Sequence, residues 1–285
     1  MSLRFGYGLN GFTDHRLGDA LAVLSELGYD GVALTLDHAH LDPFAPDLAE
    51  RTARVRGLLD RYGLDVMVET GARYVLDPRR KHEPTLVSDD GRERRIALLE
   101  TALRVAADLG SPAVSFWSGV ARPGAGAEVL ADRLADGITR LLPLADQLGI
   151  DLALEPEPGM VVHNIADALA LRHRLGEPER LRLTLDIGHL RCVEDDSPEQ
   201  CVRDVGPLVA NVQIDDMRRG VHEHLPFGEG EIEFPPVLRA LSDIGFTGLV
   251  AVELPRHTYA APALAAQSIV FLRAAQHASP LEVPV

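Results

Sequence analysis

Apolar and polar residues along the chain form two kinds of stretch. In the first, Leu, Ile, Val and Ala recur every three or four residues, as in "RRIALLETALRVAADL" and "EVLADRLADGITRLLPLADQL", which is typical of amphipathic helices. In the second, short apolar runs are nearly continuous, as expected for parallel strands that are covered on both faces. The eight strand candidates fall at about residues 4–9, 31–36, 65–70, 112–117, 150–155, 182–186, 209–214 and 249–253.

A local pattern links the two kinds of stretch. A helical segment ends at a glycine, where a left-handed residue is favoured, and an apolar strand begins within about two or three residues. The glycines are Gly28, Gly63, Gly110, Gly149 and Gly245. The average spacing of about 35 residues is near that of one βα unit. The pattern therefore predicts an α/β fold, a (β/α)8 TIM barrel that forms a single domain over residues 1–285.

Composition and charge narrow the range of partners. The 285 residues are 46% hydrophobic and carry a net charge of −15, which would repel a phosphate backbone, so we expect no nucleic-acid partner. The two cysteines, Cys192 and Cys201, have the spacing of neither a zinc motif nor a disulfide framework. No signal-peptide pattern and no apolar run near the roughly 18 residues of a membrane span are present. We therefore expect a cytoplasmic protein without a membrane partner.

The candidate chemistry lies where the predicted strands end, because barrels of this kind place their function there. Glu155, Asp186 and Glu253 directly follow apolar runs at the fifth, sixth and eighth strands, and Gln213 ends the seventh. Three converging carboxylates would repel one another without a cation or shared protons. A divalent metal ion is the simplest solution, and oxygen ligands favour Mn, Mg or Co over Zn.

Further polar residues extend this candidate site. The prolines that follow Glu155 and Glu157 favour extended backbone at both acids, and a period of two places both side chains on one face. One acid could then bind the metal while Glu157 contacts the substrate or moves a proton. Trp117, the only tryptophan, ends the fourth strand and could contact the substrate or cap the barrel core.

The remaining candidates lie in segments interpreted as loops. His222 and His224 stand two residues apart in "NVQIDDMRRGVHEHLPFGEGE", where they could contact substrate or a second, weaker metal. Arg219 and Arg256 could hold an acidic or phosphorylated substrate. Other residues that could cover or line the pocket are His38, His40 and the lid candidate Lys81-His82-Glu83 in the long loop 73–91.

The combination of Glu155, "LDIGH" with Asp186 and His189, Gln213, "HEHLPFGEGEIEF" and Glu253 resembles the xylose isomerase-like TIM barrels over essentially the whole chain. This superfamily includes sugar and sugar-phosphate isomerases and epimerases, inosose dehydratase and a zinc AP endonuclease. Its ketose epimerases hold one metal with Glu, Asp, His and Glu from strands five to eight. The resemblance carries these ligands over to Glu155, Asp186, Gln213 and Glu253, and places His189 on a histidine that faces the substrate.

Two departures from the resemblance limit what it implies. Gln213 replaces the histidine of the epimerases, and its amide oxygen is a neutral, weak ligand. The fourth ligand is therefore either Gln213 or a water, the substrate or His224. His222-Glu223-His224 resembles the Asp-x-His pair of the AP endonuclease, but "VETG" and "FWSG" stand where that enzyme has further zinc-binding histidines, so DNA repair is not expected.

The resemblance implies a metal-dependent isomerase or epimerase of a small sugar, sugar phosphate or polyol-derived ketone. Glu155 and Glu253 would lie on opposite faces of the substrate, one removing a proton beside the carbonyl and the other returning it through an enediolate. His189 or His224 would stabilise the oxyanion. The alternatives are a dehydratase of the inosose dehydratase type, a multinuclear zinc phosphodiesterase and a non-catalytic sugar- or metal-binding barrel. Because relatives often form dimers or tetramers, we expect a homodimer or homotetramer.

Overall fold

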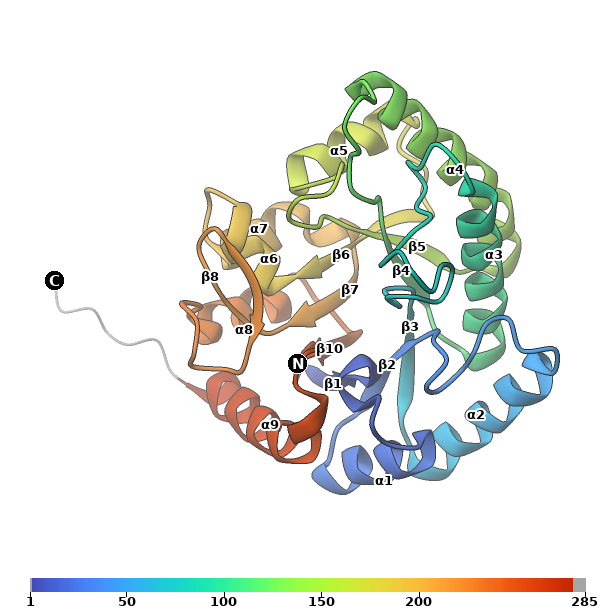
Figure 1. Ribbon diagram of the computed structural model, residues 1–285. Helices are drawn as coiled ribbons and strands as arrows, with labels where there is room; N and C mark the ends of the chain where they lie inside the picture. Colours follow the sequence, from blue (N-terminus) through green and yellow to red (C-terminus); the bar gives the residue numbers. More distant parts are fainter. Residues whose placement is uncertain (1, 279–285) are drawn as a thin grey trace, which may run out of the picture.

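The computed structural model describes residues 2–278 and shows a closed barrel of parallel strands surrounded by helices (Figure 1). The barrel strands are β1 (Arg4–Gly8), β2 (Gly31–Thr35), β3 (Asp65–Glu69), β4 (Ala113–Trp117), β5 (Asp151–Glu155), β6 (Leu181–Asp186), β7 (Val209–Ile214) and β10 (Leu249–Val252). They close in the order β1-β10-β7-β6-β5-β4-β3-β2, which confirms the predicted (β/α)8 barrel. Residues 1 and 279–285 of the predicted domain lie outside the described residues.

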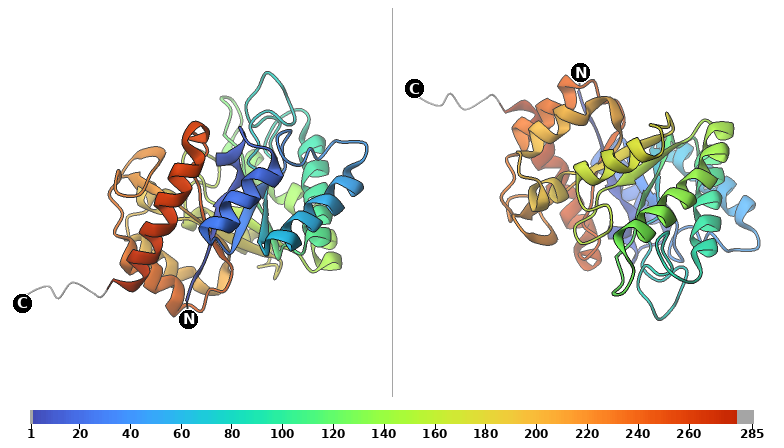
Figure 2. Two further views of the ribbon diagram at one scale, coloured as in Figure 1. Left: turned by 90° about the horizontal axis from the view of Figure 1, so that it is seen from below. Right: turned by 90° about the horizontal axis from the view of Figure 1, so that it is seen from above.

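Helices cover the outside of the barrel between successive strands (Figures 1 and 2). They are α1 (Leu17–Leu27), α2 (Leu48–Tyr62), α3 (Arg92–Leu109), α4 (Ala127–Leu148), α5 (Ile165–Arg174), α6 (Ile187–Val193), α7 (Pro198–Val205), α8 (Phe234–Asp243) and α9 (Ala261–His277), with short 3-10 turns η1 (Leu9–Phe12), η2 (Gly206–Leu208) and η3 (Thr258–Ala260). The five glycines predicted to end helices all have positive φ angles, between 64° and 83°. Within residues 2–278, none of the helices has both the length and the apolar character that crossing a bilayer requires.

The interior of the barrel changes from apolar to polar along its axis. A small apolar cluster fills its lower part: Met67, Ala113, Ala153 and Leu249. Further along the strands, the hydroxyl of Thr184 donates to Ser115 Oγ at 2.9 Å, and Asn211 Nδ2 lies 3.4 Å from Thr184 Oγ1. Because inward residues alternate along a strand, the next inward residues after Thr184 and Asn211 are Asp186 and Gln213. The strands thus deliver polar side chains to the end of the barrel where function is expected.

An antiparallel hairpin follows β7, formed by β8 (Asp216–Arg218) and β9 (Val221–Leu225). The interpretation of this segment as a loop is wrong. Gly220, with a φ of 71°, permits the tight turn between the paired residues Arg218 and Val221. The alternation in "VHEHL" then places His222 and His224 on one face of β9.

The buried carboxylate of Asp216 fixes the "GEGEIEF" segment to this hairpin. It accepts hydrogen bonds from the backbone N–H of Gly228 at 2.8 Å and of Ile232 at 3.1 Å. Gly230 lies so close to Asp216 that a Cβ atom there would overlap the carboxylate. This segment of the sequence therefore has a structural role, because it holds the hairpin in place against the barrel.

Candidate active site

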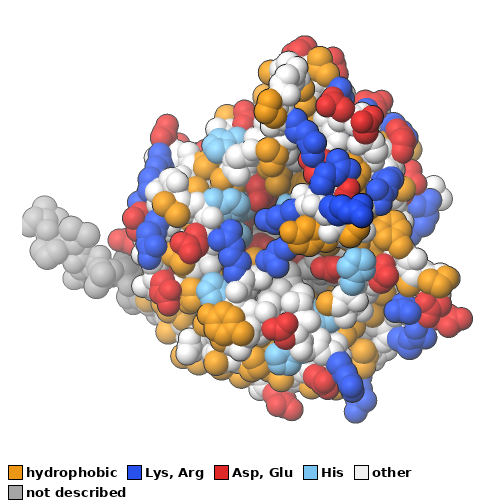
Figure 3. Space-filling model, in the orientation of Figure 1, with side chains coloured by type: hydrophobic (Ala, Val, Ile, Leu, Met, Phe, Trp, Pro, Cys, Tyr) orange, Lys and Arg blue, Asp and Glu red, His pale blue; other side chains and the backbone are white. Residues whose placement is uncertain are grey.

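A cavity of about 120 Å³ opens at the C-terminal ends of the barrel strands. Figure 3 shows it as a hollow in the face of the molecule that Figure 1 presents. The predicted site residues that line it are Trp117, Glu155, Glu157, His189, Gln213, His222, His224 and Glu253. Asp186 is 1% exposed and lies beneath them, with a carboxylate oxygen close to those of Glu155 and Glu253.

The register of the strands brings these side chains to one level. Trp117 pairs with Glu155 across β4 and β5, and Asp186 pairs with Gln213 across β6 and β7. Glu253 follows β10 directly, and its backbone N–H still donates to the carbonyl of Ile214 at 3.1 Å. Residues that are far apart in the sequence therefore converge because parallel strands end at the same edge.

Three carboxylates form the centre of the site. Oxygen atoms of Glu155, Asp186 and Glu253 all lie within 4.8 Å of one another, although they come from β5, β6 and the end of β10. Burial, followed by the negative charge of neighbouring acids, raises the pKa of Glu155 well above its ordinary value. Burial is also the largest cause that raises the pKa of Glu253. Ionising all three groups together thus requires a compensating positive charge.

The donor atoms present fit a divalent cation. Gln213 Nε2 donates to Glu253 Oε2, which fixes the orientation of the amide and leaves Gln213 Oε1 without a hydrogen-bond partner among the described residues. Asp186 Oδ2 is likewise buried and lacks a hydrogen-bond partner within residues 2–278. Buried polar atoms are normally satisfied. Two such oxygens beside two further carboxylates are the ligands expected for a hard metal ion.

Three histidines line the side of the cavity next to this group. His189 Nε2 lies 3.0 Å from His222 Nε2, and His189 Nδ1 lies 3.3 Å from the carbonyl oxygen of Pro156. His224 Nδ1 contacts the carboxylate of Asp215. Burial lowers the pKa of His189 to about 4 and that of His222 to about 3, so both rings are neutral at pH 7. One nitrogen from each of His189, His222 and His224 lies within 4.8 Å of the others, so this group could hold a second ion.

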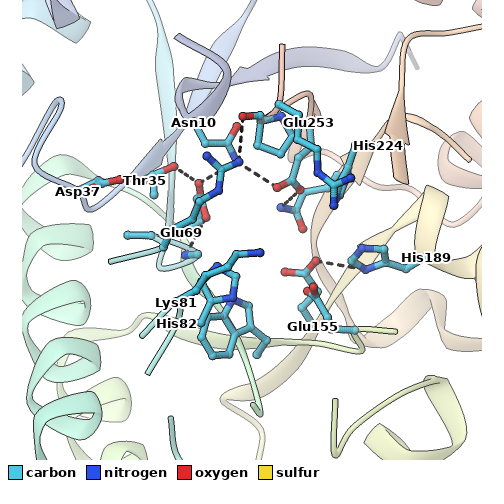
Figure 4. Close-up of a pocket in the computed structure, with 18 of the residues that line it drawn as sticks. Asn10, Thr35, Asp37, Glu69, Lys81, His82, Glu155, His189, His224 and Glu253 are labelled. Carbon is cyan, nitrogen blue, oxygen red and sulfur yellow. Dashed lines mark hydrogen bonds and ion pairs between the residues drawn. The ribbon is translucent and has the colours of Figure 1, made fainter. Parts of the chain in front are cut away.

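On the side of the cavity formed by β1, β2 and β3, the sequence indicated Glu69 as an acid at a strand end but missed Asn10 and Thr35. Asn10, after β1, donates through Nδ2 to Glu253 Oε1 at 3.0 Å and lies 3.4 Å from Glu69 Oε1. Thr35, at the end of β2, donates to Glu69, which is 5% exposed (Figure 4). The signal was the same as for the acids, a polar residue where a strand ends. It was overlooked because neutral side chains do not indicate a metal site on their own.

The loop candidates divide into residues that reach the cavity and residues that do not. Lys81, His82 and Arg256 line it. Glu83 instead pairs with Arg122 at 2.9 Å. The other candidates that do not line the cavity are His38, His40 and Arg219.

Arg219 was predicted to contact substrate, but its guanidinium lies outside the cavity. It pairs with Asp195 at 2.8 Å and also contacts the carbonyl oxygen of Glu194. His40 Nε2 lies 3.0 Å from the carbonyl oxygen of His15. The sequence showed that these residues were polar and near a strand end, but it could not show the partners that hold their side chains elsewhere.

The long loop after β3 is fixed from below by a buried arginine. Arg95 on α3 donates to the carbonyl oxygens of Pro84 at 3.0 Å and His82 at 2.7 Å. The guanidinium of Arg95 also lies 4.6 Å from the ring centre of Trp117. The ring of His82 contacts Trp117 as well, with the two ring centres 5.0 Å apart. Trp117 is thus held between Arg95 and His82 while it lines the cavity. Figure 2 shows this teal segment projecting beyond the ends of the strands.

Comparison with known proteins places the chain in a family. The family model described as "xylose isomerase-like TIM barrel" matches residues 21–275. A curated relative, the L-ribulose-5-phosphate 3-epimerase UlaE of Shigella flexneri serotype 5b, is 26% identical over 251 residues, which cover 86% of this chain and 84% of the relative. The enzyme of the same name from Salmonella heidelberg is 25% identical over 248 residues, covering 85% and 84%.

Solved structures share the fold across nearly the whole chain. D-allulose 3-epimerase from Methylomonas sp. superposes with a TM-score of 0.75 at 19% identity, covering 96% of this chain and 98% of that one. D-psicose 3-epimerase from Clostridium cellulolyticum H10 gives a TM-score of 0.76 at 15% identity, with coverage of 96% and 99%. At these identities the likeness establishes the architecture, and activity has to be argued from the site itself.

Proposed function

This chain belongs to the xylose isomerase-like TIM barrel family, and on that premise we propose that it is an isomerase or epimerase of a small sugar or sugar derivative. The observation that carries the proposal is the placement of Glu155 and Glu253. These carboxylates enter the cavity from the ends of different strands, β5 and β10, and their oxygen atoms come within 4.8 Å of one another; Figure 4 shows both side chains directed into the cavity. The relatives named as sugar 3-epimerases support the same reaction class.

Proton transfer by Glu155 and Glu253 accounts for either reaction. One carboxylate takes the proton from the carbon beside the substrate carbonyl, and the C–H electrons form the double bond of an enediolate. If the second carboxylate returns a proton to the opposite face of that carbon, the configuration inverts and the product is an epimer. If the proton returns to the former carbonyl carbon, and the hydroxyl proton of the neighbouring carbon moves to the former carbonyl oxygen, the neighbouring carbon becomes the new carbonyl and the product is an isomer. The pKa values of both groups, which burial raises above the ordinary range of a glutamate, favour this role, because a carboxylate with a raised pKa is a stronger base.

The negative charge that develops on the substrate oxygen requires hydrogen-bond donors nearby. His189 and His222 share one hydrogen bond between their Nε2 atoms at 3.0 Å, and both rings border the cavity. We propose that a substrate oxygen takes over the N–H now shared by these two rings. Glu157, whose Oε1 lies 3.8 Å from His222 Nε2, would orient that ring.

The residues that would hold the metal ion are Glu155, Asp186, Gln213 and Glu253. A bound divalent ion would polarise the carbonyl and offset the charge of the three acids. We propose Mn, Mg or Co rather than Zn, because every donor atom in this set is an oxygen. A cytoplasmic location, the absence of a nucleic-acid or membrane partner and an assembly of two or four chains stay predictions from the sequence.

Solvent exchange at the substrate carbon tests the proposed proton transfer. A panel of ketoses is incubated with the manganese-loaded protein in D2O, and loss of the C–H signal beside the carbonyl is followed by NMR. Glu155→Gln and Glu253→Gln should each abolish exchange. Glu223→Gln is the matched control, because Glu223 lies between His222 and His224 on β9 but does not line the cavity. The metal content of each variant separates a lost base from a lost ion.

The outcomes also separate the alternative functions. Unchanged exchange in both glutamine variants would sink the two-base scheme. A product 18 mass units lighter would instead identify a dehydratase that expels a β-hydroxyl as water. Binding of two or more zinc ions, with the histidine group as one site, would favour the phosphodiesterase alternative.

A further inference from the structure

The mouth of the cavity carries three cationic side chains from two segments. Lys81, the only lysine of the chain, and Arg73 come from the loop after β3, and Arg256 comes from the segment after β10. All three line the cavity. Figure 3 shows blue side chains gathered around the hollow, in a molecule whose net charge is −15. Such a local concentration of positive charge focuses anions toward the opening.

None of the three cations pairs with a carboxylate within 4.0 Å among residues 2–278. On the outer surface, by contrast, arginines such as Arg140 pair with acids at 2.5 Å. Glu83, two residues after Lys81 in the loop, pairs with Arg122 at 2.9 Å. The positive charge at the mouth is thus not used to neutralise the protein's own acids.

The three cations repel one another in the absence of an anion. After burial, Arg73 and Arg256 are the next largest causes that lower the pKa of Lys81, and both outweigh the opposite effect of Glu157. Arg73 NH2 donates to the carbonyl oxygen of Pro255 at 3.0 Å, next to Arg256 in the chain. This bond joins the two segments across the mouth and holds like charges near one another, an arrangement that an anion between them would stabilise.

We propose that the substrate carries a terminal phosphate or carboxylate, which Lys81, Arg73 and Arg256 bind at the mouth while its carbonyl end reaches Glu155 and Glu253. This inference rests on the proposed function, since it assigns the substrate class of the same cavity. Guanidinium groups bind such oxyanions through paired N–H donors, and the ammonium of Lys81 adds a point charge. The cationic mouth of the cavity would then bind the charged end of the substrate, and the acidic interior would hold its carbonyl end.

Kinetic preference tests this substrate class. Manganese-loaded protein is assayed with a ketopentose 5-phosphate, the same ketopentose without phosphate, and a ketouronic acid such as fructuronate. We expect kcat/KM for one of the anionic sugars to exceed that for the neutral ketopentose at least a hundredfold. Lys81→Gln and Arg256→Gln should each reduce this preference about tenfold, mainly through KM, because the anion lies away from the reacting carbon.

Arg79→Gln is the matched control, because Arg79 is exposed in the same loop but does not line the cavity. It should leave both activity and preference unchanged. A preference for the sugar phosphate or for the sugar carboxylate shows which anionic group the substrate carries, and either result supports the inference. The inference would be overturned if kcat/KM were equal for neutral and anionic sugars, or if Lys81→Gln and Arg79→Gln changed the preference for anionic sugars equally.

Binding of inorganic phosphate supplies a readout that does not depend on turnover. Isothermal titration of the manganese-loaded protein should show at least tenfold weaker phosphate binding in the Lys81→Gln/Arg256→Gln double variant than in Arg79→Gln, with similar melting temperatures. If no ketose is turned over but this difference is found, the proposed function fails and the anion site stands. If ketoses are turned over but phosphate binds all variants alike, the function stands and the anion site is refuted.

Discussion

Replacing Gln213 by leucine tests whether its amide belongs to the metal site. The side chain is 4% exposed. Its amide nitrogen Nε2 donates a hydrogen bond to Glu253, whereas its amide oxygen Oε1 has no partner among the described residues and is free to bind a metal ion. Leucine has a similar size and removes both ends of the amide. The substitution should therefore change the metal-free and the metal-bound protein by different amounts.

In the metal-free protein two effects oppose each other. Loss of the hydrogen bond to the Glu253 carboxylate costs about 1.5–3 kcal/mol, whereas removal of an unsatisfied buried oxygen returns about 1–3 kcal/mol. The free energy of unfolding should therefore stay within about 2 kcal/mol of that of the unmodified protein. In the metal-bound protein the lost ligand should weaken binding about 10- to 100-fold, or about 1.4–2.7 kcal/mol.

The assay combines a manganese titration with urea unfolding at fixed metal concentration. At a metal concentration about 1,000 times the Kd, binding stabilises a protein by about 4.1 kcal/mol, and a tenfold weaker site leaves about 2.7 kcal/mol. Asn211→Leu is the matched control, because Asn211 is the preceding inward residue of β7 and does not line the cavity. It should lower stability without changing the Kd for manganese. An unchanged Kd in Gln213→Leu would refute the assignment of Gln213 as a ligand.

Two further predictions concern acid titration and the loop after β3. Burial raises the pKa of Glu157 from 4.5 to about 7, so the folded metal-free protein favours the protonated form of this group. The contribution of Glu157 to the free energy of unfolding should therefore be greatest below about pH 4.5, and about 3 kcal/mol of it should be lost as the pH rises through 7. Urea unfolding from pH 4 to 8 should show this loss, and Glu157→Gln should remove it; an identical pH dependence in both proteins would contradict the prediction. Arg95→Met should cost about 2–4 kcal/mol, because two buried carbonyl oxygens lose their donor, and should speed trypsin cleavage at Arg79, Arg80 or Lys81. Urea unfolding and timed digestion measure both effects, and an unchanged cleavage rate would show that Arg95 does not hold the loop.

The barrel could be predicted from the sequence because its signals are local and repeated. A continuous apolar run identifies a strand wherever both faces are buried, and Gly28 or Gly149 marks the end of a helix because a left-handed residue is needed there. The predicted and observed bounds of every barrel strand differ by at most one residue at either end. Glu155 and Asp186 could be found for the same reason, since a strand end fixes where the next side chain lies.

Other parts of the site depend on contacts that the sequence does not encode locally. Asn10 and Thr35 matter because they donate to Glu253 and Glu69, which lie 243 and 34 residues away. The hairpin that carries His222 was missed because its strands are short and polar, and because it packs on α6 instead of extending the barrel. Arg219 was misplaced because its partner Asp195 lies in another loop.

The division of charge within the cavity explains why sequence similarity alone leaves the substrate open. The acids lie at strand ends, whose positions the barrel fixes, so they can persist across relatives with different substrates. The cations at the mouth lie on Lys81 and Arg256, in segments whose length and course the barrel does not fix. A family match therefore constrains the residues proposed to transfer the proton more strongly than the residues proposed to select the substrate. If the anionic sugars prove to be preferred, specificity will have been set by loop residues such as Arg256, which the sequence could name as a candidate but could not place beside Lys81 and Arg73.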